Sequence, residues 1–245
     1  MCAQVGEVNT GSVDALPEIA ELARQAGAWL HVDGAFGLWA AASQELRGLI
    51  EGVDEADSWA TDAHKWLNIP NDCGLAFVAH PEAHRAAMAM TAEYLVVDSE
   101  AARDAMDWTP EFSRRARGVA VYAALRSLGR SGVAELVERC CRHARRFGEE
   151  LGRLPGCEIL NDVVLNQVLM RFADDATTRA VLETVQRSGE AWMSGRPGTD
   201  ASRSASRSRT GERATRTSHA PWPRSSEPSP RADRPRARVS PNRPR

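Results

Sequence analysis

The chain has 245 residues, 42% of them hydrophobic, and a formal net charge of −2 at pH 7. This is enough apolar material for a real core, and no stretch approaches the roughly 20 consecutive apolar residues that a membrane-spanning helix needs. The first residues lack the basic and apolar regions of a secretory signal, and the five cysteines form no C-x-x-C pair, which favours reduced thiols. We therefore expect a cytoplasmic protein with no membrane partner.

Short apolar runs that end in turns alternate with helical patterns along the first 80 residues. The expected elements are strands that run into turns within 2–8, 28–37, 56–66 and 73–80, and helices at 16–27 and 43–50. The second of these strands ends at Asp33 and is followed by a Gly-rich bend. The first helix has Pro17 near its start and Gly27 near its end, which is the usual order of helix punctuation. Alternating strands and helices predict βαβ units and an α/β fold on a largely parallel sheet.

A different pattern follows residue 109. The expected elements there are helices at 110–132, 133–154 and 174–189 and strands at 157–162 and 163–172. Helices with a small sheet predict a second, α+β domain. After Gly195 the sequence loses its periodicity, eight of the 13 prolines occur there, and arginines outnumber acidic residues. Such a segment cannot bury a core and is expected to be disordered.

The predicted organisation therefore has four parts. Residues 1–98 form a large domain, 99–109 a linker, 110–195 a small C-terminal α+β domain and 196–245 a disordered tail rich in Arg, Ser and Pro.

Lys65 is the only lysine among 31 basic residues. A lysine amine can lose its proton and attack a carbonyl, whereas a guanidinium stays charged and is a poor nucleophile. Asp33 ends one expected strand, and Asp62, His64 and Lys65 follow the next. Ligands bind at the carboxyl ends of parallel strands, so these residues form a candidate site. The plain alternative is a surface lysine.

Two motifs carry a family resemblance: "HVDGAFG" at 31–37 and "DSWATDAHKWL" at 57–67. Together they resemble the pyridoxal phosphate (PLP) dependent group II amino-acid decarboxylases, of the aromatic-amino-acid and glutamate type. The resemblance extends from about Gly6 to Gly195. It implies part of the large domain of the aspartate aminotransferase fold, PLP fold type I, followed by a small C-terminal domain.

The resemblance assigns a cofactor role to three residues. Lys65 would hold the PLP aldehyde as an imine, a bond that only a primary amine can form. Asp33 would accept a charge-assisted hydrogen bond from the pyridine nitrogen and keep the ring an electron sink. Ala35 matches the small side chain that relatives place against one face of the ring.

Four further residues take weaker roles from the same resemblance. His64 would lie near the imine and the substrate as a catalytic residue, although it could equally be a structural histidine. Asp62 occupies a position near the cofactor phosphate in relatives. Asn9 and Thr10 end the first strand, where they could contact the ring hydroxyl of PLP or the substrate.

The implied activity is that of a carboxy-lyase, an amino-acid decarboxylase whose substrate is a small molecule, an amino acid, and whose complete form is a homodimer. Animal relatives carry a loop tyrosine that protonates the product, and its position falls near Ala105, where the loop has no tyrosine. An aldehyde-forming enzyme, another lyase or an aminotransferase therefore stays open as an alternative.

Two departures from the family lead us to expect a fragment with little or no activity. The N-terminal half of the family domain, with its phosphate-binding turn and ring-stacking aromatic residue, does not precede Met1. After Gly195 the expected strand is replaced by a Ser/Ala/Arg alternation, for which we advance a reading-frame shift as the hypothesis.

Three further features of the sequence allow other interpretations. His31, Asp33, Asp62 and His64 could form a nitrogen- and oxygen-rich metal site. The basic tail could bind nucleic acid, although it lacks interleaved aromatic residues and we expect no specific nucleic-acid partner. The arginines of "SRRARG" at 113–118 could be a solvated helix face or could hold a carboxylate or phosphate.

Overall fold

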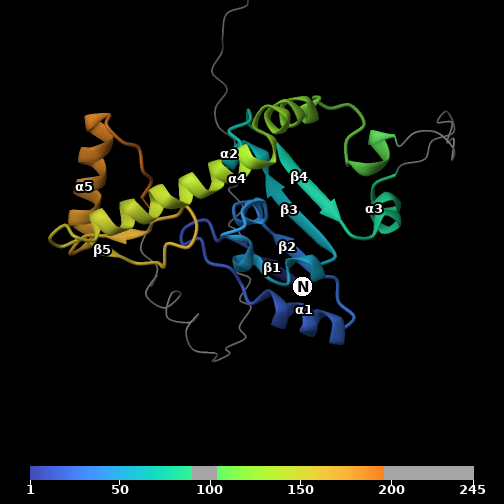
Figure 1. The fold of residues 1–245 in the computed structure, drawn as a ribbon, viewed down its shortest axis with the longest axis horizontal. Helices are drawn as coiled ribbons and strands as arrows, with labels where there is room; N and C mark the ends of the chain where they lie inside the picture. The colour runs from blue at the N-terminus through green and yellow to red at the C-terminus, as the bar shows by residue number, and fades with distance from the viewer. Residues whose placement is uncertain (90–103, 196–245) are drawn as a thin grey trace, which may run out of the picture. The chain divides into compact units, whose positions relative to one another are not determined.

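The computed structural model describes residues 1–89 and 104–195. Its strands are β1 (Cys2–Gln4), β2 (His31–Asp33), β3 (Ser58–Asp62), β4 (Gly74–Val78), β5 (Glu158–Ile159) and β6 (Met170–Arg171). The α-helices are α1 (Leu16–Gln25), α2 (Ala63–Trp66), α3 (Pro81–Met88), α4 (Arg117–Leu151) and α5 (Asp175–Ser188). The 3-10 helices are η1 (Gly37–Ala42), η2 (Arg47–Ile50), η3 (Val53–Glu55) and η4 (Ala105–Trp108). Figure 1 shows these elements coloured along the chain.

The larger sheet has the strand order β1-β2-β3-β4. β1, β2 and β3 pair in parallel, whereas β4 pairs with β3 in the antiparallel sense. The link from Asp62 to Gly74 contains only α2 and a loop, and a parallel crossover needs a dozen or more residues. The predicted α/β fold on a largely parallel sheet is confirmed, and β4 departs from the βαβ pattern expected for it.

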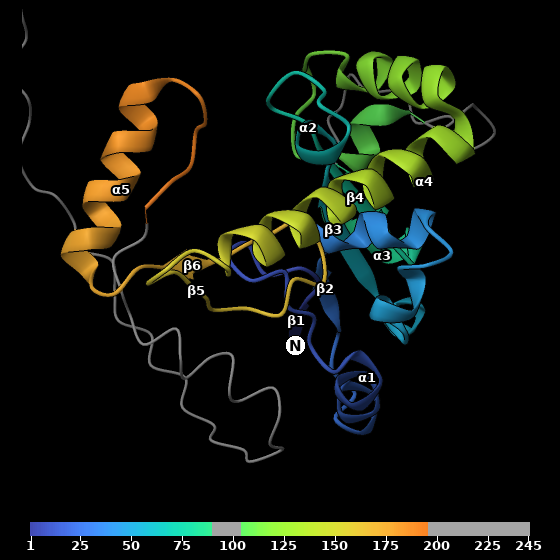
Figure 2. The same ribbon diagram turned by 60° about the vertical axis from the view of Figure 1, so that its left-hand side comes forward.

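The main core joins the sheet to helices from both halves of the chain. Val5 and Val32 come from the sheet region and Leu16 from α1, while Val137 and Cys141 come from α4. The buried positions of α4 recur every three or four residues, so they share one face of the helix. Figures 1 and 2 show α4 running beside the sheet that shares this core.

Two expected helical regions differ in detail. Residues 43–50 form no α-helix: Ser43 is the residue after η1, and η2 begins at Arg47. The Ser43 hydroxyl accepts the N–H groups of Glu45 and Leu46, which competes with regular helical bonding. The helices expected at 110–132 and 133–154 correspond to the two helical segments of α4, which begins at Arg117 and is kinked at Gly129, where φ is +65°. Glycine adopts this conformation without a Cβ penalty.

The C-terminal part contains an antiparallel β5–β6 pair and α5. β5 and β6 lie beside the C-terminal end of α4 in both views (Figures 1 and 2). The division into two domains stays a prediction, and the 196–245 tail and most of the 99–109 linker lie outside the described residues. Within residues 1–89 and 104–195, no helix is long and apolar enough to cross a bilayer.

Candidate active site

The carboxyl ends of β1, β2 and β3 meet at one edge of the sheet because these strands are parallel. Asp33 is the last residue of β2 and Asp62 the last of β3. Lys65 follows on α2, directly after β3, while Asn9 and Thr10 lie in the turn region after β1. The chain order thus brings the predicted residues of three segments to the same edge.

Lys65 is held between a carboxylate and an aromatic ring. Its Nζ lies 2.8 Å from Asp62 Oδ2 and 3.9 Å from the ring centroid of Phe36. The Lys65 side chain is 28% exposed, so the amine is partly shielded yet reachable. Two indole N–H groups fix these neighbours: Trp66 donates to the Phe36 carbonyl at 2.6 Å, and Trp39 donates to the Asp62 carbonyl at 3.1 Å.

His64 is fixed through one ring nitrogen. His64 Nδ1 lies 3.1 Å from both the backbone nitrogen and the carbonyl oxygen of Cys73. We assign the ring hydrogen to Nε2, because the Cys73 carbonyl already accepts the N–H of Ala63 whereas the buried N–H of Cys73 needs an acceptor. Nε2 lies 4.0 Å from Asp62 Oδ2. The N–H of Ala63 donates to the Cys73 carbonyl at 2.9 Å, which holds the two segments together. His64 can therefore offer a hydrogen at Nε2 toward the side chains around Lys65.

Asp33 leaves its carboxylate accessible at the end of β2. One oxygen, Oδ1, accepts the N–H of Ala35 at 3.1 Å, and the residue is exposed. Among the described residues no side chain is recorded as a donor to this carboxylate. Gly34 permits the tight bend, because a Cβ there would lie 2.7 Å from the Leu38 Cβ. An exposed carboxylate with a free oxygen, followed by a small side chain, fits a cationic ring nitrogen.

Asn9 and Thr10 turn back toward Glu7. The Glu7 carboxylate accepts both backbone N–H groups, the Asn9 amide at 2.5 Å and the Thr10 hydroxyl at 2.9 Å. Burial works to raise the pKa of Glu7, but these hydrogen bonds outweigh it and hold the pKa below its usual value. Asn161 donates to the Thr10 carbonyl at 2.8 Å from the C-terminal part. The turn is thus rigidly held, and its side chains are largely occupied.

The metal interpretation has no site to occupy in the described part of the chain. No group of three or more His, Cys, Asp or Glu side chains that could hold a metal occurs in residues 1–89 and 104–195. His31 instead places Nδ1 2.8 Å from the hydroxyl of Ser58, on the β2–β3 pair. Asp62 and His64 gather around Lys65.

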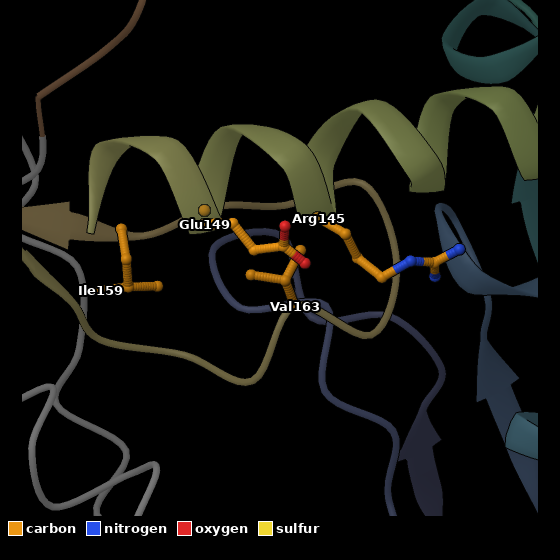
Figure 3. A pocket seen from close by; sticks show the side chains of 5 residues that line it. Arg145, Glu149, Ile159 and Val163 are labelled. Carbon is orange, nitrogen blue, oxygen red and sulfur yellow. The ribbon is translucent and has the colours of Figure 1, made fainter. Parts of the chain in front are cut away.

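A hollow of about 260 Å³ lies away from these residues. It is lined by Arg145, Gly148, Glu149, Ile159 and Val163 (Figure 3). Figure 3 shows Arg145 and Glu149 extending from α4, with Ile159 and Val163 on the segment that faces it. None of the predicted site residues lines this hollow, and it carries no group suited to the chemistry above. The candidate site is defined by its side chains rather than by a cavity.

Several contributors to this site were missed by reasoning from the sequence, among them Phe36, Trp66 and Glu7. Phe36 lies inside the "HVDGAFG" motif and Trp66 directly after Lys65, so their positions were visible but their contacts were not. Glu7 gave no signal, because a glutamate near a turn has no local pattern that reveals what it binds.

The conserved domain of pyridoxal-dependent decarboxylases matches residues 1–173. The 4-hydroxyphenylacetaldehyde synthase of Rhodiola rosea is 32% identical over 203 residues, which cover 80% of this chain and 41% of that protein. A tyrosine decarboxylase of Oryza sativa subsp. japonica is 38% identical over 152 residues, which cover 60% of this chain and 28% of that protein. The chain thus spans less than half the length of these relatives.

Solved structures of two plant enzymes share the fold of this chain. The crystal structure of the Rhodiola rosea 4-hydroxyphenylacetaldehyde synthase superposes with a TM-score of 0.69 at 30% identity, covering 80% of this chain and 42% of that one. The Oryza sativa TDC, crystallised with PLP and tryptamine, gives a TM-score of 0.73 at 25% identity, covering 79% and 42%. With the match over 1–173, the shared fold and the lysine-bearing edge, this chain belongs to the pyridoxal-dependent decarboxylase family, whose cofactor is PLP.

Proposed function

We propose that this chain carries the lysine-bearing part of a PLP-dependent carboxy-lyase that acts on an amino acid. The observation that supports this most is the setting of Lys65. The only primary side-chain amine of the chain lies between Asp62 and Phe36, at the strand edge where Asp33 exposes its carboxylate. We further propose a cytoplasmic homodimer with no specific nucleic-acid partner.

Lys65 and Asp33 are the residues that would hold the cofactor. Lys65 Nζ would bond to the aldehyde carbon, and Asp33 would accept a hydrogen bond from the ring nitrogen through the oxygen that Ala35 leaves free. Bound PLP supplies an electron sink for the electrons left when a bond at the substrate Cα breaks. Asp33 keeps that sink effective because its negative charge favours the protonated ring nitrogen.

Asp62 and His64 would orient and exchange protons at Lys65. Asp62 Oδ2 lies 2.8 Å from Nζ and directs the amine. With the hydrogen assigned to Nε2, which lies 4.0 Å from Asp62 Oδ2, His64 would donate it to a group bound beside Lys65. Asn9 and Thr10 would contribute mainly through the backbone of their turn, since Glu7 engages both side chains.

An aldehyde-forming reaction is the second candidate. Two relatives are named aldehyde synthases, the Rhodiola rosea protein and the phenylacetaldehyde synthase of Arabidopsis thaliana, 28% identical over 205 residues. Ala105, where a decarboxylase tyrosine was sought, lies in η4, and that short helix contains no tyrosine. Tyr94 lies outside the described residues. The products separate the two: a decarboxylase releases CO₂ and an amine, whereas an aldehyde synthase also consumes water and a two-electron oxidant such as dioxygen. The synthase releases CO₂, an aldehyde, ammonia and the reduced oxidant, which is hydrogen peroxide in the case of dioxygen.

Covalent attachment is tested on the 245-residue chain itself. After incubation with PLP, we expect a visible absorption band that borohydride removes, leaving a reduced adduct on the peptide that contains Lys65. Lys65→Arg keeps the charge and should abolish the adduct on that peptide together with the part of the band that it accounts for. Because Lys65 is the only lysine, the α-amino group of Met1 is the competing amine, and peptide mapping distinguishes the two. The assignment is refuted if the wild-type chain carries its adduct on the Met1 peptide and none on the Lys65 peptide.

A further inference from the structure

The ring of His64 depends on a loop that comes later in the chain. Its Nδ1 lies 3.1 Å from both the backbone nitrogen and the carbonyl oxygen of Cys73, and the tautomer assigned above lets it accept the Cys73 N–H. The Cys73 carbonyl accepts the N–H of Ala63 at 2.9 Å. Cys73 is only 2% exposed, so this link is shielded from water. The position and tautomer of the imidazole are therefore set by whatever holds Cys73 in place.

Asp72, the residue before Cys73, is hydrogen-bonded by Arg117, the first residue of α4. Arg117 Nε donates to the Asp72 carbonyl oxygen at 3.0 Å and to Oδ1 at 3.2 Å. Its Nη2 donates to Oδ1 and to Oδ2, each at 3.1 Å. The backbone N–H of Asp72 and then Arg117 hold the pKa of the Asp72 carboxyl below its usual value. Arg117 thus binds both the side chain and the main chain of Asp72.

Apolar packing supports the same contact. The loop and α2 share a small core with α4, formed by Ala63, Leu67, Ile69, Cys73 and Val133. Side chains from the first half of α4 pack against it, namely Ala120, Val121, Ala124 and Leu128. α4 is therefore the platform on which the Lys65 helix and its following loop rest, and Arg117 is the polar contact at the start of that platform.

We propose that Arg117 is a positioning residue for His64, acting through Asp72 and the backbone of Cys73. An arginine suits this role because its planar fork can donate to several oxygens at once, which an ammonium cannot do in a fixed geometry. The neighbouring Arg114 has a longer ion pair with Glu111, 3.9 Å between charged atoms. Of the two roles considered for the arginines of residues 113–118, Arg117 therefore has the second: it holds a carboxylate, that of Asp72 in the same chain.

The chemical consequence of this role rests on the proposed function, but the contact can be tested without cofactor. In the deuterated, ¹⁵N-labelled full chain, the Cys73 N–H···Nδ1 bond should give a measurable nitrogen–nitrogen coupling across the hydrogen bond. We expect that coupling in the wild type and in Arg115→Gln, an exposed neighbour that serves as the matched control.

Removal of the Arg117–Asp72 contact should raise the rate of local opening in the loop before β4 and leave the sheet unchanged. In Arg117→Gln and Asp72→Asn we expect the coupling to vanish and the Cys73 amide to exchange about tenfold faster or more, which is a loss of about 1.4 kcal/mol in local opening. The Val32 amide, in the fully buried centre of the sheet, should keep its protection. Arg117→Lys should behave like Arg117→Gln if the fork matters rather than the charge.

Several results would overturn the proposal. It is wrong if the wild type lacks the coupling, if Arg117→Gln keeps both coupling and protection, or if Arg115→Gln loses them equally. If Arg117→Gln does not fold, Asp72→Asn decides alone, because it is exposed and nearly isosteric. PLP attachment is measured separately on Lys65, so either idea can fail while the other stands.

Discussion

Ser43 makes a buried contact between distant parts of the chain, and its removal should be costly. The residue is fully buried, and its hydroxyl donates to Glu138 Oε1 on α4 at 2.6 Å. The same oxygen accepts the N–H groups of Glu45 at 3.1 Å and Leu46 at 3.3 Å. Ser43→Ala removes the donor to Glu138 and the acceptor of both backbone groups without adding bulk.

The size of the effect follows from these contacts. A hydrogen bond to a charged group contributes about 1.5–3 kcal/mol, and a buried donor left without a partner costs about 1–3 kcal/mol. Because the terms share one oxygen they do not simply add, and we expect Ser43→Ala to lower the free energy of unfolding by about 3 kcal/mol. With a urea slope of about 2 kcal/mol per molar, the unfolding midpoint falls by about 1.5 M.

Urea titration followed by tryptophan fluorescence measures this directly. Ser131→Ala, at an exposed position of α4, is the matched control and should leave the midpoint unchanged or slightly raised, since alanine favours helices. Combining Ser43→Ala with Glu138→Gln should give a coupling of about 1–2 kcal/mol. A midpoint change in Ser43→Ala no larger than that of the control, or fully additive effects in the double variant, would refute the contact.

Three further predictions use the titrating groups. Burial raises the pKa of Cys141 to about 11, so iodoacetamide at pH 8 should label it about 100-fold more slowly than an ordinary thiol and far more slowly than exposed Cys2; mass spectrometry that finds equal rates would contradict this. The Leu30 N–H and then His80 lower the pKa of Asp57 from 3.8, so its stabilising contribution is present above that pH and lost as the pH falls below it. The urea midpoint should therefore drop in acid, and less so in Asp57→Asn. Glu7→Gln should speed amide hydrogen exchange in the turn after β1 about tenfold, because a carboxamide cannot accept all four donors; unchanged exchange would speak against that role.

The elements that frame the site could be predicted because their signals are local. An apolar run that ends in Asp33 and a glycine bend predicted the end of β2, and the run before Asp62 predicted the end of β3. Pro17 and the spacing of apolar residues gave α1 to within two residues of its observed end at Gln25. The rule that the carboxyl ends of parallel strands share one edge of the sheet then placed these two strand ends together, and this rule depends on the topology and not on any single residue.

The contacts that fix the site could not be predicted, since they join residues far apart in sequence. Arg117 lies 45 residues from Asp72, and Asn161 lies 151 residues from Thr10. Periodicity reports which face of an element is buried but not which element covers it. The antiparallel direction of β4 was not predicted for a related reason: an apolar run in the sequence does not reveal in which direction the strand pairs.

The contacts of Lys65 sharpen the question of why the chain has one lysine. An arginine at this position could pair with Asp62 and stack on Phe36 at least as well, because its fork suits carboxylates and its plane suits aromatic faces. Neither contact therefore requires an amine. Lys65→Arg should keep the urea midpoint within about 0.3 M of the wild type, using the same slope as above, while losing the PLP adduct. A large loss of stability in Lys65→Arg would mean that packing selects lysine here, and the case for chemistry would lose its strongest argument.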